Sequence, residues 1–535
     1  MRRLDILVLF VVALVARVAA AALVDYPPYT DPAYYNLVAQ QLAGGHGFTV
    51  PVLWSFLEVG GRLPAVPALP VPSNGHWMPL TSMVASGSVA VLGPIFGAWR
   101  AAEIPMILLS SALVPFTYVV TWELWRSRST AFAAPLLVLL AGPLLVMVPL
   151  VDNFAVFGAA GAFAIWCSTR AVGSARPGPW LVAAGLAAGI ATLARVDGLL
   201  LAVAPAAAWL VRRDWSAWSV RLGWGLASAA AFLLPVVPWL VRDLTVFGSI
   251  LPSAGGHTLW ITSYNQQFSI ASDPSLGDYL GWGAANIISS KLTAWVELVG
   301  RSAVLLGGIF VIPFVVGLWR ERHRPELAPF IAYFAVMFLA MGAIFTFHAP
   351  KGAFYHSALA WLPVATGMAV ANLGPVANAA GRAWPFLRRT ATHRFLLVAG
   401  LAGAAALSLI GSSVLIGQWS DAHAKLVLAG EFLAERGARD DRVMAYDPAA
   451  LWAISGNPGV APPYDLLPVI GEVVDAYDVR CVVVTLPLGQ DRDPLSLWDG
   501  AAATDSAGNH ADFLPEEPAF SAPGVRVYEV EASAR

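Results

Sequence analysis

The sequence predicts an all-α polytopic membrane protein with a small α/β domain at its C-terminal end. Of its 535 residues, 58% are hydrophobic and 12% are charged, whereas soluble domains carry roughly 25% charged residues. A soluble fold of this size could not hide so many apolar side chains in a core. Apolar runs of spanning length recur over residues 1–416, and hydropathy falls over 417–535. Lipid is therefore the solvent that this composition fits.

The first part of the chain contains about eleven predicted spans. The apolar runs lie near residues 4–24, 103–125, 130–150, 153–170, 180–211, 219–241, 298–319, 327–347, 352–372 and 395–416. The run 180–211 is too long for one span, and the residues from Arg195 to Gly198 interrupt it. We interpret it as two short helices that meet at a polar turn. The first run is long for a signal peptide, so we interpret it as a retained helix.

Arginine positions predict the orientation, because cytoplasmic loops carry an excess of positive charge. The N-terminus, with Arg2 and Arg3, is placed in the cytoplasm. The arginines that then also fall inside are Arg126/Arg128, Arg170/Arg176, Arg212/Arg213, Arg320/Arg322/Arg324 and Arg388/Arg389/Arg394. This agreement requires the stretch 79–97 to lie on the membrane surface instead of spanning. The expected location is the plasma (cytoplasmic) membrane, with several passes and an extracytoplasmic C-terminal domain.

Three extracytoplasmic regions follow from this orientation. They are a first loop 25–102, a second loop 242–297 and the tail 417–535. In the tail, three segments are typical of strands and two of helices, so a small α/β domain is expected. The strand segments are 442–446, 480–486 and 525–530, the helical segments are 421–436 and 465–477, and a loose loop is expected over 488–524. The tail carries no cluster of catalytic residue types, so its expected role is to cover the site or recognise an acceptor.

Charge and cysteine content exclude several other classes of protein. The formal net charge is −2, so no bulk basic surface indicates nucleic acid as a partner. The two cysteines, Cys167 and Cys481, have neither the number of a disulfide framework nor the spacing of a metal site.

Two of the polar clusters at the outer helix ends contain carboxylates. Asp31 follows the first span, where Thr30 or Asp31 can cap a helix that begins at Pro32. Asp152 ends the third span and can cap the helix that follows. Alternatively, two carboxylates that different helices bring to one leaflet can act in catalysis, with Asp31 as the general base.

Two further clusters carry the cations. Arg195 lies two residues from Asp197, so the pair can neutralise each other, or Arg195 can bind a phosphate with its planar fork. The segment 347–356 gathers one lysine and two histidines. Snorkelling explains a lone lysine but explains the whole cluster less well. Carboxylates and cations at one leaflet suit group transfer from a lipid phosphate, because cations can bind the leaving phosphate while a carboxylate deprotonates the incoming hydroxyl.

At these residues the chain resembles the GT-C class of membrane glycosyltransferases. The resemblance is greatest to the branch with protein O-mannosyltransferases and the lipid A aminoarabinose transferase. The matching segments are Asp31-Pro-Ala-Tyr34-Tyr35 with 42–48, His76-Trp-Met-Pro79-Leu80, Asp152, 193–198, Arg242-Asp243 through Gly248, and Lys351 through Pro363. Each motif is loose, but together their order and topology are fairly specific.

The resemblance implies a hexosyl- or pentosyltransferase that uses a polyprenyl-phosphate sugar donor on the outer face. The acceptor would be a lipid, a glycan or a protein. Many members carry two adjacent acids in the first loop, whereas Pro32 follows Asp31 here. Relatives often carry a lysine before the Pro-Leu of this loop, whereas Trp77 and Met78 stand there, with His76 as the substitute. No residue is therefore assigned as a metal ligand, and a divalent metal stays an open alternative.

The predicted site gathers all of these residues. The catalytic residues are Asp31 and Asp152. The donor-phosphate ligands are Lys351, His348, His356, Arg195 and Arg242. The substrate-binding residues are Tyr34, Tyr35, His76 and Tyr355. The alternative function is a polytopic transporter or lipid flippase, which should show broken helices with polar residues near the midplane; only the Arg195–Asp197 turn fits that description.

Overall fold

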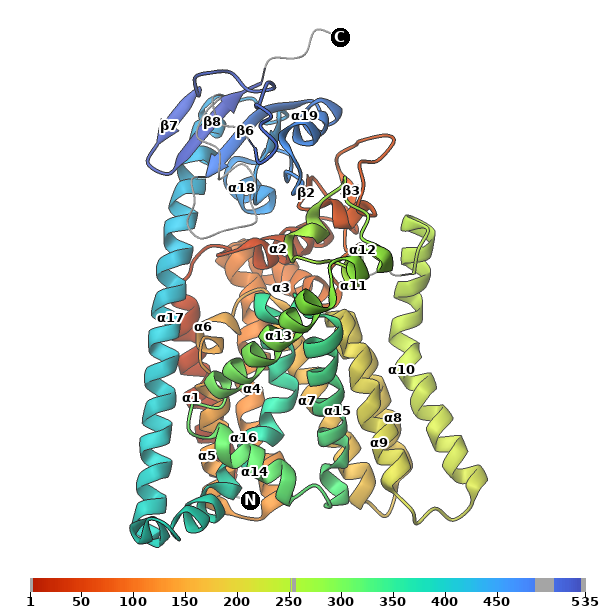
Figure 1. Ribbon diagram of the computed structural model, residues 1–535, viewed down its shortest axis with the longest axis vertical. Helices are drawn as coiled ribbons and strands as arrows, with labels where there is room; N and C mark the ends of the chain where they lie inside the picture. The colour runs from red at the N-terminus through yellow and green to blue at the C-terminus, as the bar shows by residue number, and fades with distance from the viewer. Residues whose placement is uncertain (1–2, 251, 253–255, 486–504, 531–535) are drawn as a thin grey trace.

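The computed structural model describes residues 3–250, 252, 256–485 and 505–530, and it shows a helical bundle with a small sheet at one end (Figure 1). The predicted fold class is confirmed. The helices are α1 (Arg3–Ala22), α2 (Thr30–Ala43), α3 (Leu80–Phe96), α4 (Ala98–Trp125), α5 (Arg128–Leu139), α6 (Leu144–Met147), α7 (Asn153–Gly173), α8 (Pro177–Ala194), α9 (Val203–Val211), α10 (Trp218–Phe247), α11 (Gly256–Leu259), α12 (Leu276–Gly281), α13 (Ala284–Leu305), α14 (Val311–Arg320), α15 (Ala328–Leu339), α16 (Phe354–Ala380), α17 (Thr390–Glu435), α18 (Pro448–Ser455) and α19 (Leu467–Ala476). The strands are β1 (Thr49–Val50), β2 (Val52–Leu53), β3 (Val71–Pro72), β4 (Arg442–Met444), β5 (Gly459–Val460), β6 (Val479–Thr485), β7 (Phe520–Ala522) and β8 (Val525–Glu529).

The candidate membrane helices can be compared with the eleven predicted spans. Eight of the described helices are long and apolar enough to cross a membrane, and four shorter apolar helices accompany them. One of the four, α3, begins and ends at the sheet-bearing end. Near its start the Ser82 hydroxyl donates to the Tyr35 carbonyl (3.0 Å), and just beyond its end Arg100 donates to the Val24 carbonyl above α1 (3.1 Å). Setting α3 aside leaves eleven candidate passages in the described part of the chain.

Two predicted spans are broken at glycines, so the continuous helices expected there are wrong in detail. The run 130–150 divides into α5 and α6 around Gly142, whose φ is 56°. The run 298–319 divides into the end of α13 and α14 around Gly307 and Gly308, whose φ values are 70° and 76°. Positive φ is a conformation that glycine adopts readily and other residues avoid. The run 180–211 breaks at Arg195, as expected.

The sheet draws its strands from both ends of the sequence. Its order is β2-β5-β4-β6-β8-β7. The pairs β2–β5, β5–β4 and β4–β6 are parallel, and β6–β8 and β8–β7 are antiparallel. The three strands that the tail sequence predicted are β4, β6 and β8. The sequence did not indicate β2, where Val52 and Leu53 of the first loop pair with Gly459 and Val460 of the tail.

One hydrophobic core joins the first loop to the tail. From the first loop it contains Tyr34, Leu37 and Val38 of α2 and the segment 50–57. From the tail it contains buried side chains of β4, β5, β6, β8 and α19. We refer to the first loop and the tail that share this core as the outer unit. Neither apolar face would be covered without the other.

The long helix α17 connects the bundle to the outer unit (Figure 1). It has 46 residues and runs without interruption through the predicted domain boundary at 416/417. The predicted helix 421–436 is its last part, and the predicted helix 465–477 is α19. Residues 488–504 of the predicted loose loop, and Arg2 of the predicted N-terminal charge, lie outside the described residues.

Candidate active site

Two carboxylates and an imidazole meet at the sheet-bearing end of the bundle. Asp31 lies in the first turn of α2, Asp152 immediately precedes α7, and His356 lies in the first turn of α16. Each of the three offers a ligand atom within 4.8 Å of the others. Asp152 is fully buried, and Asp31 is partly exposed. We refer to these three residues as the carboxylate cluster.

Close packing of α7 against α16 brings Asp152 and His356 together. A Cβ atom at Gly161 of α7 would lie 2.6 Å from Cβ of Ala360 on α16, and one at Gly158 would overlap Leu359. The absence of side chains at these two positions therefore allows the helix axes to approach. The rings of Phe154 and His356 stack at 3.9 Å between centroids.

Hydrogen bonds from neighbouring residues hold Asp152 and His356 of the carboxylate cluster in place. Tyr29 donates its hydroxyl hydrogen to Oδ2 of Asp152 (2.8 Å), and the Asn153 backbone nitrogen donates to Oδ1 (2.6 Å). The Asn153 side chain donates to the Tyr35 hydroxyl (3.1 Å) and lies 2.7 Å from Nδ1 of His356. Asp152 therefore caps α7 and belongs to the cluster at once. The prediction that Thr30 or Asp31 caps α2 is wrong, because the extended residue Tyr29 precedes that helix.

The turn at Arg195 borders this cluster. Nε of Arg195 donates to Oδ1 of Asp197 (2.9 Å), so the predicted mutual neutralisation is present. The Ser357 hydroxyl, next to His356 on α16, donates to the other oxygen of Asp197. Asp197 thus connects the turn to the helix that carries His356. Both side chains of the ion pair remain slightly exposed, at 18% for Arg195 and 14% for Asp197.

Charges in the cluster act on one another. Burial, followed by the negative charge of Asp31, raises the pKa of the Asp152 carboxyl. Two neighbouring carboxylates cannot both ionise without cost, which is why a like charge raises the pKa. Burial and the charges of Asp152 and Asp31 also raise the pKa of Tyr29 well above its usual value, so its hydroxyl keeps the proton that it donates.

The two histidines from neighbouring loops are uncharged near neutral pH. Burial is the main reason that the pKa of His348 is lowered to about 4 and that of His76 to about 3. The positive charge of Arg195 lowers both pKa values further. His348 was predicted as a cation for the phosphate. It can offer a hydrogen bond there, but at neutral pH it supplies no positive charge.

Other predicted site residues lie in different surroundings. Tyr34 accepts a hydrogen bond from the Asn74 nitrogen (2.7 Å) and is fully buried in the outer unit's core. Arg242 pairs with Asp243 (2.9 Å), and its guanidinium lies over the ring of Trp239 (4.6 Å). None of these contacts involves the carboxylate cluster.

Lys351 and Tyr355 lie on the connection between α15 and α16 and just after it. Lys351 is exposed, and its ammonium lies 5.6 Å from the centre of the Tyr264 ring. The guanidinium of Arg301 on α13 lies 4.7 Å from the centre of the Tyr355 ring. Of the predicted residues, the structure thus brings Asp31, Asp152, His356, Tyr35 and Arg195 together, with His76 and His348 nearby.

Sequence reasoning missed three residues of the site. Tyr29 and Asn153 hold Asp152, and Ser357 holds Asp197. Each lies next to a predicted site residue in the sequence: Asn153 follows Asp152, Ser357 follows His356, and Tyr29 lies two residues before Asp31. A polar side chain next to a candidate carboxylate at the end of an apolar run is the signal that could have identified them.

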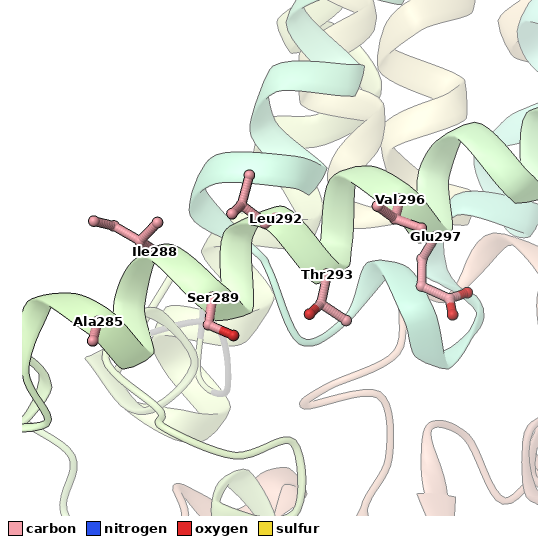
Figure 2. A pocket seen from close by; sticks show the side chains of 7 residues that line it. All are labelled: Ala285, Ile288, Ser289, Leu292, Thr293, Val296 and Glu297. Carbon is pink, nitrogen blue, oxygen red and sulfur yellow. The ribbon is translucent and has the colours of Figure 1, made fainter.

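A separate hollow lies on the surface of α13, away from these residues. Its volume is about 510 Å³, and all of its lining residues belong to that helix. Ile288, Leu292 and Val296 project from one side of the helix, and Ser289, Thr293 and Glu297 from the other (Figure 2). None of the candidate catalytic residues lines it. The exposed apolar ridge is the kind of surface that lipid chains cover.

Comparisons with known proteins identify the fold. No protein-family model and no curated protein sequence matches this chain. The crystal structure of ArnT from Cupriavidus metallidurans bound to undecaprenyl phosphate is similar with a TM-score of 0.59 and 16% identity, covering 98% of each chain. The archaeal oligosaccharyltransferase AglB from Archaeoglobus fulgidus, in complex with an inhibitory peptide and a dolichol-phosphate, has a TM-score of 0.55 and 14% identity, covering 90% of this chain and 69% of its own.

A third structure is that of the Archaeoglobus fulgidus oligosaccharyltransferase in complex with Zn and sulfate. Its TM-score is 0.55 at 14% identity, and the match covers 89% of this chain and 68% of that one. This chain therefore has the fold of the GT-C membrane glycosyltransferases, and the predicted resemblance is confirmed at the level of the fold.

Proposed function

We propose that this protein transfers a sugar from a polyprenyl-phosphate-linked donor to an acceptor hydroxyl on the extracytoplasmic face of the plasma membrane. The observation that carries the proposal is the meeting of Asp31, Asp152 and His356 beside Arg195. The structural neighbours bound to undecaprenyl phosphate and to a dolichol-phosphate support this class of donor. In this proposal the sheet-bearing end faces the extracytoplasmic side, as the arginine distribution predicts.

The reaction is a substitution at the anomeric carbon of the sugar. The acceptor oxygen forms a bond to that carbon while the bond to the phosphate oxygen breaks, and the polyprenyl phosphate leaves with the electron pair. Asp31 takes the proton of the acceptor hydroxyl, because it is the more exposed of the two carboxylates. Asp152, held by Tyr29 and Asn153, keeps the geometry of the cluster.

Arg195 and Lys351 are the proposed ligands of the phosphate. Arg195 lies within electrostatic reach of the carboxylate cluster, and its partner Asp197 orients the guanidinium. Lys351 lies on the segment that also carries His348. An arginine can form two parallel hydrogen bonds to a phosphate, whereas a lysine acts as a point charge.

The carboxylate cluster also fits a divalent cation. Two carboxylates and one imidazole are a common ligand set for such ions, and Tyr29 and Asn153 already hold Asp152 and His356 by hydrogen bonds. Bound there, a divalent cation would offset the negative charge of the donor phosphate. Asp31, Asp152 and His356 are the residues that would hold it.

The test is sugar transfer by the purified protein in detergent micelles. Labelled polyprenyl-phosphate hexose and pentose donors are offered separately with a cell-envelope extract as acceptor, and product is measured before and after chelation and metal replacement. Label should pass to an acceptor from at least one donor. A transporter or flippase needs a sealed bilayer, so absence of transfer in micelles together with movement of labelled lipid in proteoliposomes would overturn the proposal.

A further inference from the structure

The segment that connects α15 to α16 is not a continuous α-helix. It contains two short π-helical turns, Ala340–Ile344 and Ala349–Ala353. Within the second turn Gly352 has a φ of 120°, so the helical path is interrupted beside Lys351. Hydrogen bonds along a continuous helix therefore cannot fix the positions of His348 and Lys351. Contacts from outside the segment have to do so.

The second loop supplies such contacts. Oε1 of Gln267 lies 3.3 Å from Nε2 of His348, and Gln267 is only 3% exposed. The Gln267 side chain also donates to the Tyr264 carbonyl (3.0 Å). The Tyr264 ring lies 5.8 Å from the imidazole of His348 and 5.6 Å from the ammonium of Lys351. Two residues of one loop thus hold the segment: Gln267 contacts His348, and Tyr264 lies beside both His348 and Lys351.

The tail in turn fixes that loop through one carboxylate. The Ser269 hydroxyl donates to Oδ1 of Asp465, and the backbone nitrogen of Ile270 donates to Oδ2 (2.7 Å). The backbone nitrogen of Ala271 lies 3.4 Å from Oδ1. We refer to Asp465 with these three donors as the Asp465 latch. Beside it, the Tyr464 nitrogen donates to the carbonyl of the loop residue before Ser269 (3.1 Å).

Apolar packing holds the loop residues of the Asp465 latch against the outer unit. Phe268 and Ile270, on either side of Ser269, pack against the hydrophobic core of the outer unit. A carboxylate that accepts several hydrogen bonds at once holds its partners in one geometry, because charge-assisted bonds are stronger than neutral ones. Movement of the tail relative to the bundle would therefore be transmitted to residues 264–271.

We propose that Asp465 is a positioning residue for the donor phosphate. Through residues 264–271 it holds His348 and Lys351 in the place where the phosphate binds, so the tail is part of the donor site without touching the donor. This inference rests on the proposed function for the identity of the ligand. The mechanical connection from Asp465 to residues 345–353 does not depend on it.

The experiment compares four variants of the full-length protein in detergent. Asp465→Ala removes the carboxylate, Ser269→Ala removes one donor, the third variant combines both, and Asp512→Ala removes an exposed tail carboxylate as the control. Undecaprenyl phosphate is titrated into each to obtain Kd. Hydrogen–deuterium exchange of peptides over 264–271 and 345–353 is measured without lipid.

Asp465→Ala should weaken binding of undecaprenyl phosphate about tenfold and speed exchange over both segments. Ser269→Ala should do the same to a smaller extent, the double variant should be no worse than Asp465→Ala alone, and Asp512→Ala should match wild type. A purely structural role would lower the melting temperature and leave Kd of the folded protein unchanged.

Unchanged exchange over 345–353 in folded Asp465→Ala would overturn the inference. If that variant does not fold, Ser269→Ala decides in the same way, because it removes only one hydroxyl. If wild type does not bind undecaprenyl phosphate, the proposed function fails, and the exchange data still decide whether the latch fixes the segment.

Discussion

Asp31 and Asp152 belong to one cluster, but the structure holds them differently. Asp152 caps α7 and accepts hydrogen bonds from Tyr29 and Asn153, whereas Asp31 lies in the first turn of α2 with part of its surface exposed. A carboxylate that is built into the fold is costly to replace. One that faces the solvent side of the cluster can be changed with less effect on folding.

Asp31→Asn should therefore lower turnover sharply while the protein stays folded. The substitution keeps the shape of the side chain and removes the base, and general base catalysis contributes about 100- to 10,000-fold. With divalent cations removed by chelation, donor binding and the melting temperature should stay near those of wild type. The measurements are initial rates of sugar transfer, Kd for undecaprenyl phosphate and a thermal melt.

Asp152→Asn is the contrasting variant. The asparagine would direct an amide nitrogen toward one of the two donors that Asp152 now binds. An unsatisfied buried group costs about 1–3 kcal/mol, so both turnover and the melting temperature should fall. Equal activity of Asp31→Asn and wild type would remove Asp31 from the catalytic role.

Lys351→Ala should weaken donor binding instead of removing the base. A charge-assisted contact contributes about 1.5–3 kcal/mol, which corresponds to roughly one to two decades in Kd. Lys425→Ala is the matched control, because Lys425 pairs with Asp421 on α17 and is not a predicted phosphate ligand. Kd for undecaprenyl phosphate should rise for the first variant only. An unchanged Kd would assign the phosphate to Arg195 alone.

At the residue scale, the structure brings the two predicted carboxylates together but separates several of the predicted phosphate ligands from them. Asp31 and Asp152 were recognisable because acidic residues at the ends of apolar runs are few. Arg242 lies in a segment that resembles the GT-C class, which is why it was predicted as a phosphate ligand. In the structure it packs among aromatic rings beside the first loop. The charge state of His348 could not be predicted from the sequence. Burial sets the pKa of His348, and its burial depends on contacts with residues far along the chain.

At the element scale, hydropathy predicted where the long apolar helices lie and missed where they break. Gly142, Gly307 and Gly308 have positive φ values that interrupt otherwise apolar runs. A glycine in such a run more often continues a membrane helix, where close packing favours it, than ends one. The break at Arg195 was predictable because polar residues accompany it.

The buried histidines of the loops should make stability depend on pH. The unfolded pKa of histidine is about 6.5, and the folded pKa of His348 is about 4. Between these values the unfolded chain binds a proton that the folded chain does not. The stabilisation is therefore fully present above pH 6.5 and is lost as the pH falls toward 4.

The measurement is the melting temperature of wild type and of His348→Asn across this range. The variant should show a shallower decline, and some decline should remain because His76 has a folded pKa of about 3. Identical slopes for the two proteins would show that His348 is protonated equally in the folded and unfolded states.

At the scale of the whole molecule, the outer unit is the feature that could not be predicted from the sequence. The tail strands were recognisable by composition, but nothing local shows that Val52 and Leu53 would pair with Gly459 and Val460. Such a parallel pairing depends on contacts across about three quarters of the chain, which sequence patterns do not record. Because the first loop and the tail share a core, Asp31 and the tail sit on one structural unit.

The orientation of the whole molecule can be tested with reporter fusions. If the eleven candidate passages start from a cytoplasmic N-terminus, the C-terminus lies outside, so a reporter that is active only in the cytoplasm should be silent when fused after Arg535. The same reporter fused after Gly381, between α16 and α17, should be active. Both ends of α17 are tested in this way, since it is the last long helix among the described residues. The opposite pattern would place the carboxylate cluster on the cytoplasmic face, where a donor used outside could not reach it, and the proposed function would fail with the orientation.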